Sequence, residues 1–384
     1  MIQRPRVLVT VGTDAARDTT AGPRRDYAVL AETLGATLLD RRDVGRSRIA
    51  RAIRQVAGLA TAQAWLAFSR RGEYDAIVTD GEHVGIPLAM MLRLSRAPVR
   101  HITIGHRLSS RKKWIFFRGL SAHRRIDRIA VHSRLQFNIA IAKLGVEPER
   151  LALVPYQVDT AYWRPDAVAE ERLVVSAGLE HRDYATLFRA VEGLGAQVVI
   201  GAASNWSRHE FAEVARPANV LVDSFDYASL RDLYARAALV VVPLADVDNQ
   251  AGVTTILEAM SMGKAVVVTQ SLGQTDVVED RRLQARGPLR PRPASLTRRF
   301  AEHARIPVEP TGLYVAPGDS DGLRRAISYL LEHPDERAHL GRAARRTVEA
   351  LFTVEQFAER MRALVDSCLQ PSRENRLERR ASYG

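Results

Sequence analysis

The sequence predicts an α/β protein built from two doubly wound, Rossmann-like domains, and three observations support this prediction. The chain has 384 residues, and a single hydrophobic core stops growing at roughly 250–300 residues. Short β-branched apolar runs alternate with helical patterns, which is typical of parallel sheets covered by helices on both faces. The alternation pauses near residues 158–165 and then resumes, so we expect a link between the domains there.

The first half contains apolar runs that are short enough to be buried strands. Strands are predicted over residues 7–11, 36–39, 75–79, 99–104, 128–131 and 151–154. Helices are predicted over residues 27–34, 48–70, 86–94 and 133–144.

The second half repeats this organisation. Strands are predicted over residues 173–176, 196–200, 220–222, 239–243 and 265–269, and helices over residues 184–193, 211–215, 229–237, 254–262, 321–332 and 335–351. Residues 281–305 interrupt the pattern with eight Arg and three Pro, so we expect an insertion loop that is helical over 295–304.

These elements predict the domain boundaries. An N-terminal domain is expected over residues 1–160 and a C-terminal domain over 166–350. A C-terminal helix at about 352–370 is expected to pack back onto the first domain. The polar residues 371–384 are expected to form a flexible tail.

The composition limits the possible functions. The formal net charge is +12, and 52 of the 56 basic residues are Arg, which fits either a compositional bias or an anionic partner. Cys368 is the only cysteine, which excludes a disulfide within the chain and a cysteine metal site. No zinc, helix-turn-helix or RNA-binding signature accompanies the charge, so we expect no nucleic-acid partner.

The N-terminus and the hydropathy pattern predict where the protein works. Residues 1–6 lead directly into an apolar run without the long apolar core of a signal peptide. No stretch approaches 18 apolar residues. We therefore expect a cytoplasmic protein, and peripheral contact with the inner face of the membrane stays open.

The junction at residues 239–269 carries the clearest chemistry. A buried strand ends in a polar loop, and a helix opens at Gly252. Ligands of parallel sheets bind at the carboxyl ends of strands, where helix N-termini present free N–H groups that suit phosphate. We expect Gly252, Val253 and Thr254 to contact a phosphate, and Glu258, about one turn further, to accept hydrogen bonds from ribose hydroxyls.

This stretch resembles the signature of the retaining glycosyltransferases of family 4, the glycosyl transferases group 1 type. Their signature has a Glu, seven residues and a second Glu followed by Ala-Met, and Glu258-Ala259-Met260 matches its second half. Gln250 stands where the family has its first Glu, which contacts the donor sugar. An amide still hydrogen-bonds hydroxyls, but it carries no charge.

Weaker fragments extend the resemblance over nearly the whole chain: Ile129–Ser133, Leu144–Val146, Val154–Asp159, Trp163–Pro165 and Gly312–Asp319. The resemblance implies a GT-B fold, in which the two domains face each other across a cleft. It also implies a hexosyltransferase that moves a sugar from a nucleotide-sugar donor with retention of configuration. Such enzymes need no metal and serve polysaccharide or glycoconjugate biosynthesis.

The resemblance also suggests two catalytic residues. Arg182 falls at the place of a family Lys that neutralises the donor diphosphate, while the family's upstream Arg is missing. His106 falls at the place of a His that faces the reacting sugar. Each residue could instead be structural, as a surface Arg capping a helix or as a buried His. Asp80 and His83, after the strand at 75–79, are further candidates.

Two glycines follow other predicted strands. Gly12 ends the first strand and is expected to allow close approach of a ligand, although the family's second Gly is absent. Gly201, with Ala202, Ala203 and Ser204, could touch the nucleotide, but an ordinary loop is the better explanation.

Residues 107–125 contain seven Arg or Lys around Trp114, Ile115, Phe116 and Phe117. Basic residues around an aromatic patch fit binding to anionic lipid. The alternative is an amphipathic helix whose aromatic side chains lie in the core.

Three hypotheses follow. The first is a glycosyltransferase with the donor on the C-terminal domain, an acceptor (a glycan, a lipid-linked glycan or a small molecule) on the N-terminal domain, and closure that excludes water. The second is a catalytically degenerate protein that binds a nucleotide sugar, motivated by Gln250 and by the missing upstream Arg. The third is a GT-B epimerase, which shares the fold.

Overall fold

The structure is a computed structural model that describes residues 4–15, 22–95, 98–202, 215–281, 289 and 295–370. Two predicted features fall outside the described residues, namely the tail at 371–384 and nearly all of the helix at 211–215. The same holds for most of the predicted insertion loop between residues 281 and 295. Its predicted helix is present as α11 (Leu296–Ala304), with Ser295 as N-cap.

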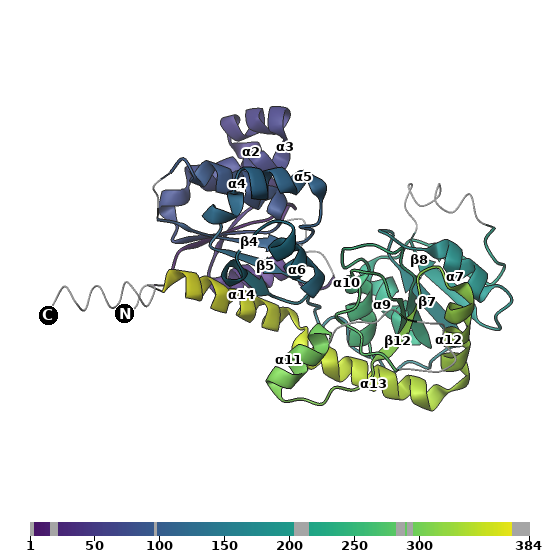
Figure 1. The fold of residues 1–384 in the computed structure, drawn as a ribbon. Coiled ribbons are helices and arrows are strands. Elements are labelled where there is room, and N and C mark those ends of the chain that lie inside the picture. Colours follow the sequence, from purple (N-terminus) through teal and green to yellow (C-terminus); the bar gives the residue numbers. More distant parts are fainter. Residues whose placement is uncertain are drawn as a thin grey trace. The chain divides into compact units, whose positions relative to one another are not determined.

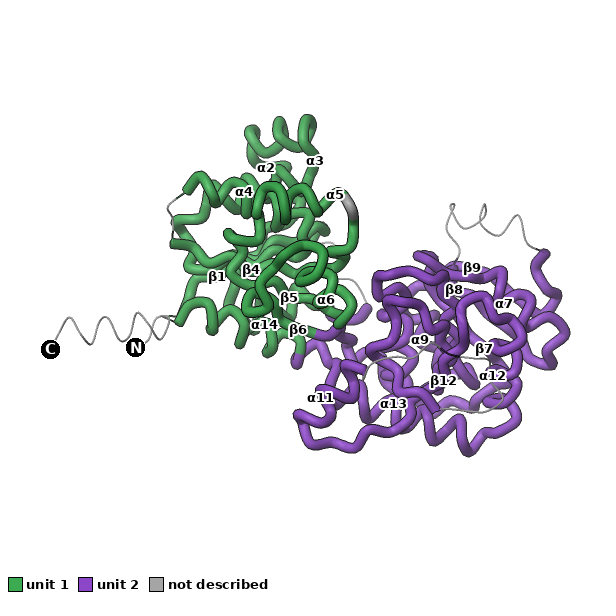
Figure 2. Tube along the Cα trace, viewed as in Figure 1, with its two compact units in different colours: residues 1–20, 25–154, 357–384 green, residues 21–24, 155–356 purple. Residues whose placement is uncertain are grey.

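The chain divides into two compact units, which are coloured separately in Figure 2. Unit 1 comprises residues 1–20, 25–154 and 357–384, and unit 2 comprises residues 21–24 and 155–356. The chain therefore passes between the units near residues 20, 25, 154 and 356.

Unit 1 contains a six-stranded parallel sheet in the order β2-β1-β3-β4-β5-β6. Strands β4 and β5 of this sheet are labelled in Figure 1. Its strands are β1 (Val7–Thr10), β2 (Thr37–Leu39), β3 (Ala76–Thr79), β4 (Arg100–Gly105), β5 (Arg128–Val131) and β6 (Leu151–Leu153). Its main helices are α1 (Asp26–Leu34), α2 (Arg41–Arg46), α3 (Arg48–Ser69), α4 (Glu82–Leu92), α5 (Arg111–Trp114), α6 (Arg134–Ala142) and most of α14 (Val354–Leu369). Short turns accompany them: η1 (Arg71–Glu73), the π-helical η2 (Ile115–Gly119), η3 (Ala122–Arg125) and η4 (Pro148–Arg150).

Unit 2 contains a second six-stranded parallel sheet in the order β12-β11-β10-β7-β8-β9. Its strands are β7 (Leu173–Ala177), β8 (Gln197–Gly201), β9 (Val220–Asp223), β10 (Leu239–Val242), β11 (Ala265–Thr269) and β12 (Gly312–Val315). Its helices are α7 (Tyr184–Val191), α9 (Tyr227–Arg236), α10 (Val253–Ser261), α11, α12 (Ser320–Glu332) and α13 (Pro334–Leu351). The edge strand β12 was not predicted, because its Gly-Leu-Tyr-Val run is short and follows the irregular insertion.

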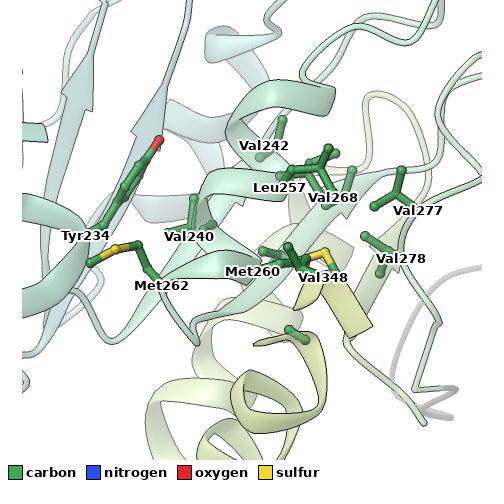
Figure 3. Close-up of a cluster of buried hydrophobic side chains, with 14 of the residues drawn as sticks. Tyr234, Val240, Val242, Leu257, Met260, Met262, Val268, Val277, Val278 and Val348 are labelled. Atoms are coloured by element: carbon green, nitrogen blue, oxygen red, sulfur yellow. The ribbon is translucent and has the colours of Figure 1, made fainter. Parts of the chain in front are cut away.

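Alternate residues of the same strand enter different cores, which shows that both faces of the unit 2 sheet are covered. Val240 and Val242 of β10 belong to one buried cluster, whereas Leu239 and Val241 belong to another. The first cluster also contains Tyr234, Leu257, Met260 and Met262, so α9 and α10 pack on that face (Figure 3). Burying apolar surface at roughly 25 cal/mol per Å² is what stabilises this layered arrangement. The predicted doubly wound α/β fold is confirmed in both units.

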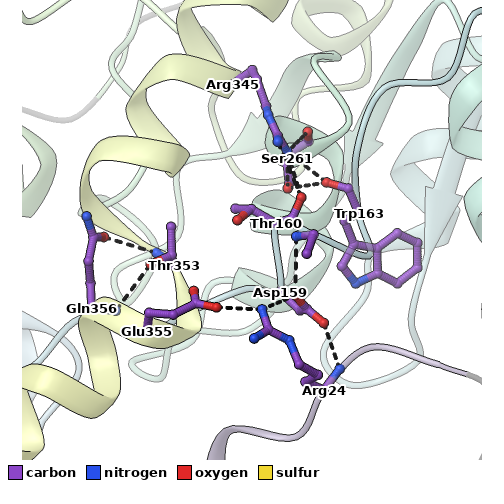
Figure 4. Close-up of polar contacts among 10 residues, drawn as sticks. Arg24, Asp159, Thr160, Trp163, Ser261, Arg345, Thr353, Glu355 and Gln356 are labelled. Atoms are coloured by element: carbon purple, nitrogen blue, oxygen red, sulfur yellow. Dashed lines mark hydrogen bonds and ion pairs between the residues drawn. The ribbon is translucent and has the colours of Figure 1, made fainter. Parts of the chain in front are cut away.

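A polar network fixes the segment that opens unit 2 (Figure 4). The buried Asp159 carboxylate accepts hydrogen bonds from the backbone N–H of Arg24 at 2.8 Å and from its guanidinium at 2.6 Å. The same guanidinium forms an ion pair with Glu355 at 2.6 Å. Arg345 donates to the carbonyl oxygen of Trp163 at 2.8 Å and to that of Ser261 at 2.7 Å. The network therefore ties residues 159–163 to α10 and α13 within unit 2.

Candidate functional site

Each sheet has a switch point, where the connections from two neighbouring strands run to opposite sides. It lies between β7 and β10 in unit 2, and between β1 and β3 in unit 1. Ligands of open α/β sheets bind outside the carboxyl ends of the strands at such points. The residues that follow these four strands are therefore the first place to look for function.

In unit 2, the loops after β7 and β10 are joined by backbone hydrogen bonds. The N–H of Asp183 donates to the carbonyl oxygen of Pro243 at 3.1 Å, and the N–H of Ala245 donates to that of His181 at 3.0 Å. These bonds enclose an antiparallel bridge between Arg182 and Leu244. The backbone around Arg182 is thus fixed at the switch point.

The Arg182 side chain is held there by three neutral oxygens. Nε donates to the carbonyl oxygen of Ala177 at 3.0 Å, Nη1 to that of Glu180 at 2.9 Å, and Nη2 to Oγ1 of Thr255 at 3.2 Å. A Cβ atom at Gly178 would lie 2.3 Å from Nη2, and one at Gly252 would lie 3.4 Å from Nη1. The guanidinium therefore occupies the space that these two glycines leave.

The same place is the N-terminus of α10. Gly252 is its N-cap, with a left-handed φ of +76° and no side chain to cap the helix. The N–H of Val253 donates to the carbonyl oxygen of Gln250 at 3.3 Å, so this amide, expected to bind phosphate, already has a partner. Among the described residues, none accepts from the N–H of Thr254 or Thr255.

Positive charge is therefore concentrated at this point. A helix N-terminus carries a partial positive charge, and the Arg182 guanidinium lies beside it with neutral hydrogen-bond partners. Burial lowers the pKa of Arg182 below its usual range. An anion at the helix opening would offset both charges and would take up charge-assisted hydrogen bonds. The arrangement is therefore suited to phosphate.

Glu258 lies one turn further along α10, where it is buried. Burial raises the pKa of its carboxyl to about 8, although the Tyr234 hydroxyl and the Arg182 charge act in the opposite direction. The Tyr234 hydroxyl donates to Oε2 at 3.3 Å. A carboxyl that is protonated at neutral pH both donates and accepts hydrogen bonds, which suits a ligand carrying hydroxyl groups.

Gln250 lies in the loop after β10, together with other polar atoms that lack partners. The loops after β10 and β11 are in close contact, because a Cβ at Gly273 would lie 2.0 Å from the carbonyl oxygen of Asn249. Among the described residues, four buried oxygens of these loops find no hydrogen-bond partner: Asn249 Oδ1, Gln250 Oε1, Ser271 Oγ and Gln274 Oε1. Such atoms in a native protein call for a ligand or water.

Gly201 ends β8, and the close packing around it explains why a glycine stands there. A Cβ there would lie 3.3 Å from Cδ2 of Phe225 and 3.7 Å from the Cβ of Ala177. Of the neighbours grouped with it in the sequence, Ala202 is buried, whereas Ala203 and Ser204 lie outside the described residues. The carbonyl oxygen of Gly201 accepts the N–H of Gly178 at 3.0 Å, so the backbone of Gly201 is joined to the glycine that lies beside the Arg182 guanidinium.

In unit 1, the switch point brings Asp80 and His106 together. Asp80 follows β3, His106 follows β4, and His106 Nε2 lies 3.1 Å from Asp80 Oδ1. Partial burial disfavours the charged imidazole, but the hydrogen bond and negative charge of Asp80 outweigh it and raise the pKa of His106. The structure therefore pairs the predicted His with a carboxylate that the sequence ranked only as a secondary candidate.

Glu82 positions His106 and was not predicted. Its carboxylate accepts the backbone N–H of His106 at 2.9 Å and that of Arg107 at 3.2 Å, and it forms an ion pair with Lys113. Burial alone would raise the pKa of Glu82, but the Lys113 ammonium and the backbone donors hold it at about 2. An acidic residue opening a helix directly after β3 was the signal available in the sequence.

Further titratable groups surround the pair. The centroids of the His106 and His132 rings lie 5.3 Å apart, and burial lowers the pKa of His132 to about 3. His132 Nδ1 lies 2.7 Å from the carbonyl oxygen of Val154, so the neutral ring carries its proton there. Burial and the negative charge of Asp80 raise the pKa of Asp26. The unit 1 site therefore combines carboxyl groups with imidazole rings, whereas the unit 2 site is cationic.

Gly12 and His83 lie beside this pair. A Cβ at Gly12 would meet only His83 Nε2, at 3.9 Å. Gly12 is exposed and has no left-handed φ, so neither its conformation nor its packing demands glycine. The open space at Gly12 admits a ligand but does not depend on this residue.

The basic aromatic segment at residues 107–125 also lies in unit 1. Phe117 is fully buried, but the side chains of Trp114 and Phe116 are each 39% exposed and that of Ile115 is 67% exposed. The alternative that placed the aromatic side chains in the core is therefore wrong for Trp114 and Phe116, and it holds for Phe117.

Two features are absent from the described residues, a membrane-spanning helix and a cluster of metal ligands. No helix in the part of the chain that the structure describes is long and apolar enough to cross a bilayer. In the same part, no three His, Cys, Asp or Glu side chains are grouped as metal ligands.

Comparison with known proteins gives a family match over the part of unit 2 that contains the Arg182 site. Residues 173–333 match the family described as Glycosyl transferases group 1, and this range contains the whole Arg182 site. No curated protein matches the sequence.

Solved structures share the fold over nearly the full chain. A sucrose-phosphate synthase from Thermosynechococcus elongatus has a TM-score of 0.67 at 17% identity, covering 95% of this chain and 99% of its own. Anabaena HepE, in complex with UDP and glucose, has a TM-score of 0.65 at 15% identity, covering 94% and 100%. A glycosyltransferase from Rickettsia africae has a TM-score of 0.65 at 12% identity, covering 96% and 100%.

These solved structures establish the architecture of the chain, and the family match identifies its C-terminal unit. The chain accordingly has the GT-B fold, and its residues 173–333 match the Glycosyl transferases group 1 family.

Proposed function

We propose that the protein transfers a hexose from a nucleoside-diphosphate sugar to an acceptor hydroxyl, with the donor held by unit 2. The observation that carries this proposal is the Arg182 guanidinium, fixed by neutral oxygens beside the open N-terminus of α10. The donor diphosphate would accept hydrogen bonds from Arg182 and from the N–H groups of Thr254 and Thr255. As the sugar leaves, negative charge grows on the diphosphate, and these donors would stabilise it.

Glu258 and Gln250 would bind the two ends of the donor. The Glu258 carboxyl, protonated at neutral pH in the free protein, would hydrogen-bond the ribose hydroxyls. The unpartnered oxygens of Gln250 and Asn249 would accept hydrogen bonds from sugar hydroxyls. Hydroxyl groups satisfy such acceptors without requiring a charge, so an amide at position 250 is compatible with sugar binding.

Asp80 and His106 of unit 1 would act on the acceptor. The hydrogen bond to Asp80 fixes the imidazole, and a protonated His106 donates to a sugar hydroxyl. The family resemblance favours retention of configuration, which NMR of the product anomer would test. Since Arg182 and the helix N-terminus supply positive charge, we propose that transfer needs no metal and continues in excess EDTA.

The donor assignment is tested by thermal-shift and calorimetric titrations with UDP, GDP, ADP and dTDP. A ligand at 100 times its Kd stabilises the native state by about 2.7 kcal/mol, which a melting curve resolves. Arg182→Ala should weaken nucleotide binding about 10- to 100-fold, because hydrogen bonds to charged groups contribute roughly 1.5–3 kcal/mol. Arg189→Ala, which removes an exposed charge from the neighbouring helix α7, is the matched control.

If Arg182→Ala bound nucleotide as tightly as the wild type while Arg189→Ala did too, the proposed donor site would be wrong. A second candidate function, nucleotide-sugar binding without transfer, is motivated by the uncharged Gln250. It predicts tight nucleotide binding with no release of sugar from any donor, and Gln250→Glu would then be expected to restore turnover.

A further inference from the structure

Unit 1 contains a cavity of about 800 Å³ that the proposed reaction leaves unassigned. It lies between α4, α5 and η2, with one contact from α3. Its walls are largely apolar side chains: Ile86, Pro87, Met90, Met91, Leu94, Phe116 and Leu120. A cavity of this size and lining matches sites that bury most of a ligand of a few hundred daltons.

The apolar surface continues outside the cavity. The side chain of Leu94 is 89% exposed, that of Ile115 is 67% exposed and that of Leu120 is 41% exposed. With Trp114 and Phe116, these residues make up five of the eleven large apolar side chains that are exposed in the described residues. We call these five residues the apolar rim. A concentration of exposed apolar side chains of this kind marks an interaction surface.

One end of the cavity is polar and belongs to the unit 1 site. Glu82 and His83 line it, and Glu82 accepts the backbone N–H of His106. A molecule with its apolar part in the cavity would therefore have its polar end beside His83 and close to the Asp80–His106 pair.

The charge around the cavity is positive. Arg93, Lys112 and Lys113 line it, and the ammonium of Lys113 neutralises Glu82, the one carboxylate of the lining. Residues 107–126 contain no Asp or Glu. The surface therefore complements an anionic partner.

We propose that this cavity and the apolar rim seat an anionic membrane lipid, and that the acceptor is a lipid of this class. The hydrocarbon chain would fill the cavity, where the flexible Met90 and Met91 side chains adapt to its shape. The rim would enter the bilayer interface, with Trp114 at the head-group level and Lys112 on anionic phosphate. A dissolved small acceptor would need the cavity but not the exposed Trp114 and Ile115, which belong to the rim without lining the cavity, so the rim favours a lipid held in a membrane.

This inference rests on the proposed function, because only a transferase needs an acceptor. Binding to the membrane and binding of nucleotide can nevertheless be measured separately, since the cavity lies in unit 1 and the proposed donor site in unit 2.

The test is co-sedimentation of the full chain with vesicles of phosphatidylcholine alone and with about 30 mol% phosphatidylglycerol, alongside UDP titration of each variant. The wild type should bind the anionic vesicles at least about 10-fold more tightly, and Trp114→Phe should abolish most of the blue shift in tryptophan emission on binding.

Ile115→Asp should reduce binding about 10-fold or more, and Lys112→Glu should remove the preference for anionic lipid. UDP affinity and melting temperature should not change, because these side chains are exposed.

Two controls match these variants. Val168→Asp alters an exposed apolar side chain of unit 2, and Arg342→Glu reverses an exposed charge on α13. Both should bind vesicles like the wild type.

The proposal is overturned if the wild type binds neither vesicle, or if Ile115→Asp binds as the wild type does. Stabilisation by dissolved dihexanoyl phosphatidylglycerol without any vesicle binding would also overturn it, because the ligand would then not come from a membrane. A protein that binds UDP but no vesicle contradicts only the lipid assignment. One that binds vesicles but no nucleotide contradicts only the donor assignment.

Discussion

The two sheets of this protein share a doubly wound topology, yet their switch points carry opposite chemistry. In unit 2, the site after β7 and β10 combines an arginine with an open helix N-terminus, and its buried Glu258 is neutral at pH 7. In unit 1, the site after β1, β3 and β4 combines Asp26, Asp80 and a His106 whose pKa is raised.

This difference shows that the shared fold determines where a ligand can bind, whereas the loop residues determine the charge of each binding site. Parallel strands and helix N-termini provide a concave edge in both units. A cationic side chain at one edge suits a diphosphate, while a carboxylate–imidazole pair at the other suits hydroxyl groups and proton transfer. Two copies of one architecture can thus divide a transfer reaction into donor binding and acceptor chemistry.

The largest expected effect is a loss of turnover that leaves donor binding unchanged. His106→Ala should lower kcat about 100-fold, because positioned acid–base groups typically contribute roughly 10²–10⁴-fold. Asp80→Asn should have a smaller effect of about 10-fold, since it only weakens the positioning of the imidazole. UDP affinity should be unchanged in both variants, and exposed His339→Asn on α13 is the control. A loss of nucleotide binding in His106→Ala would show that the two sites do not divide the work in this way.

The next effect is a difference in nucleotide affinity between variants at two glycines. Gly178 has a φ of +98°, and its Cβ would lie 2.3 Å from the Arg182 guanidinium, so Gly178→Ala should displace that group and weaken nucleotide binding about 30-fold. Gly12→Ala meets nothing closer than 3.9 Å and should leave nucleotide affinity and stability unchanged. Calorimetric titration of UDP into both variants measures the contrast, and equal affinities would argue against a fixed guanidinium.

The last effect concerns the pH dependence of stability, and it is the smallest of these effects when it is expressed per pH unit. The pKa of Glu258 is raised from 4.5 to about 8 in the folded protein, so between these values the folded state binds more protons than the unfolded state. Its contribution to the free energy of unfolding is therefore complete below about pH 4.5 and is lost as the pH rises toward 8. Relative to Glu258→Gln, the wild type should lose up to about 1.4 kcal/mol per pH unit in this window. Urea unfolding at several pH values across this window tests this, and parallel pH profiles for the two proteins would show that Glu258 is not buried in its neutral form.

Much of the fold was predictable because buried parallel strands have a simple signature. The apolar runs of β10 (Leu239–Val242) and β11 (Ala265–Thr269) are bounded by helices and glycines, so their positions were predicted within one residue. The edge strand β12 was missed because four residues after an Arg- and Pro-rich segment give little periodicity. The π-helical turn η2 was missed because its aromatic run resembles an ordinary helix.

The site was predictable where local sequence determines chemistry. A helix opening at Gly252 with Glu258 one turn later is visible in sequence, and so is an Arg after β7. The Asp80–His106 contact and the Glu82 anchor join residues 26 and 24 positions apart, so only the pairing of β3 with β4 brings them together. Thr255 was missed because its role depends on the position of the Arg182 guanidinium.

The most direct test of the division between the two sites is hydrogen–deuterium exchange of the full chain with and without saturating UDP. The account predicts slower exchange at residues 177–184 and 250–258 of unit 2, with no change at residues 79–83 and 105–108 of unit 1. Protection confined to unit 1, or no protection at residues 250–258 despite saturation, would contradict the assignment of the donor to the Arg182 site.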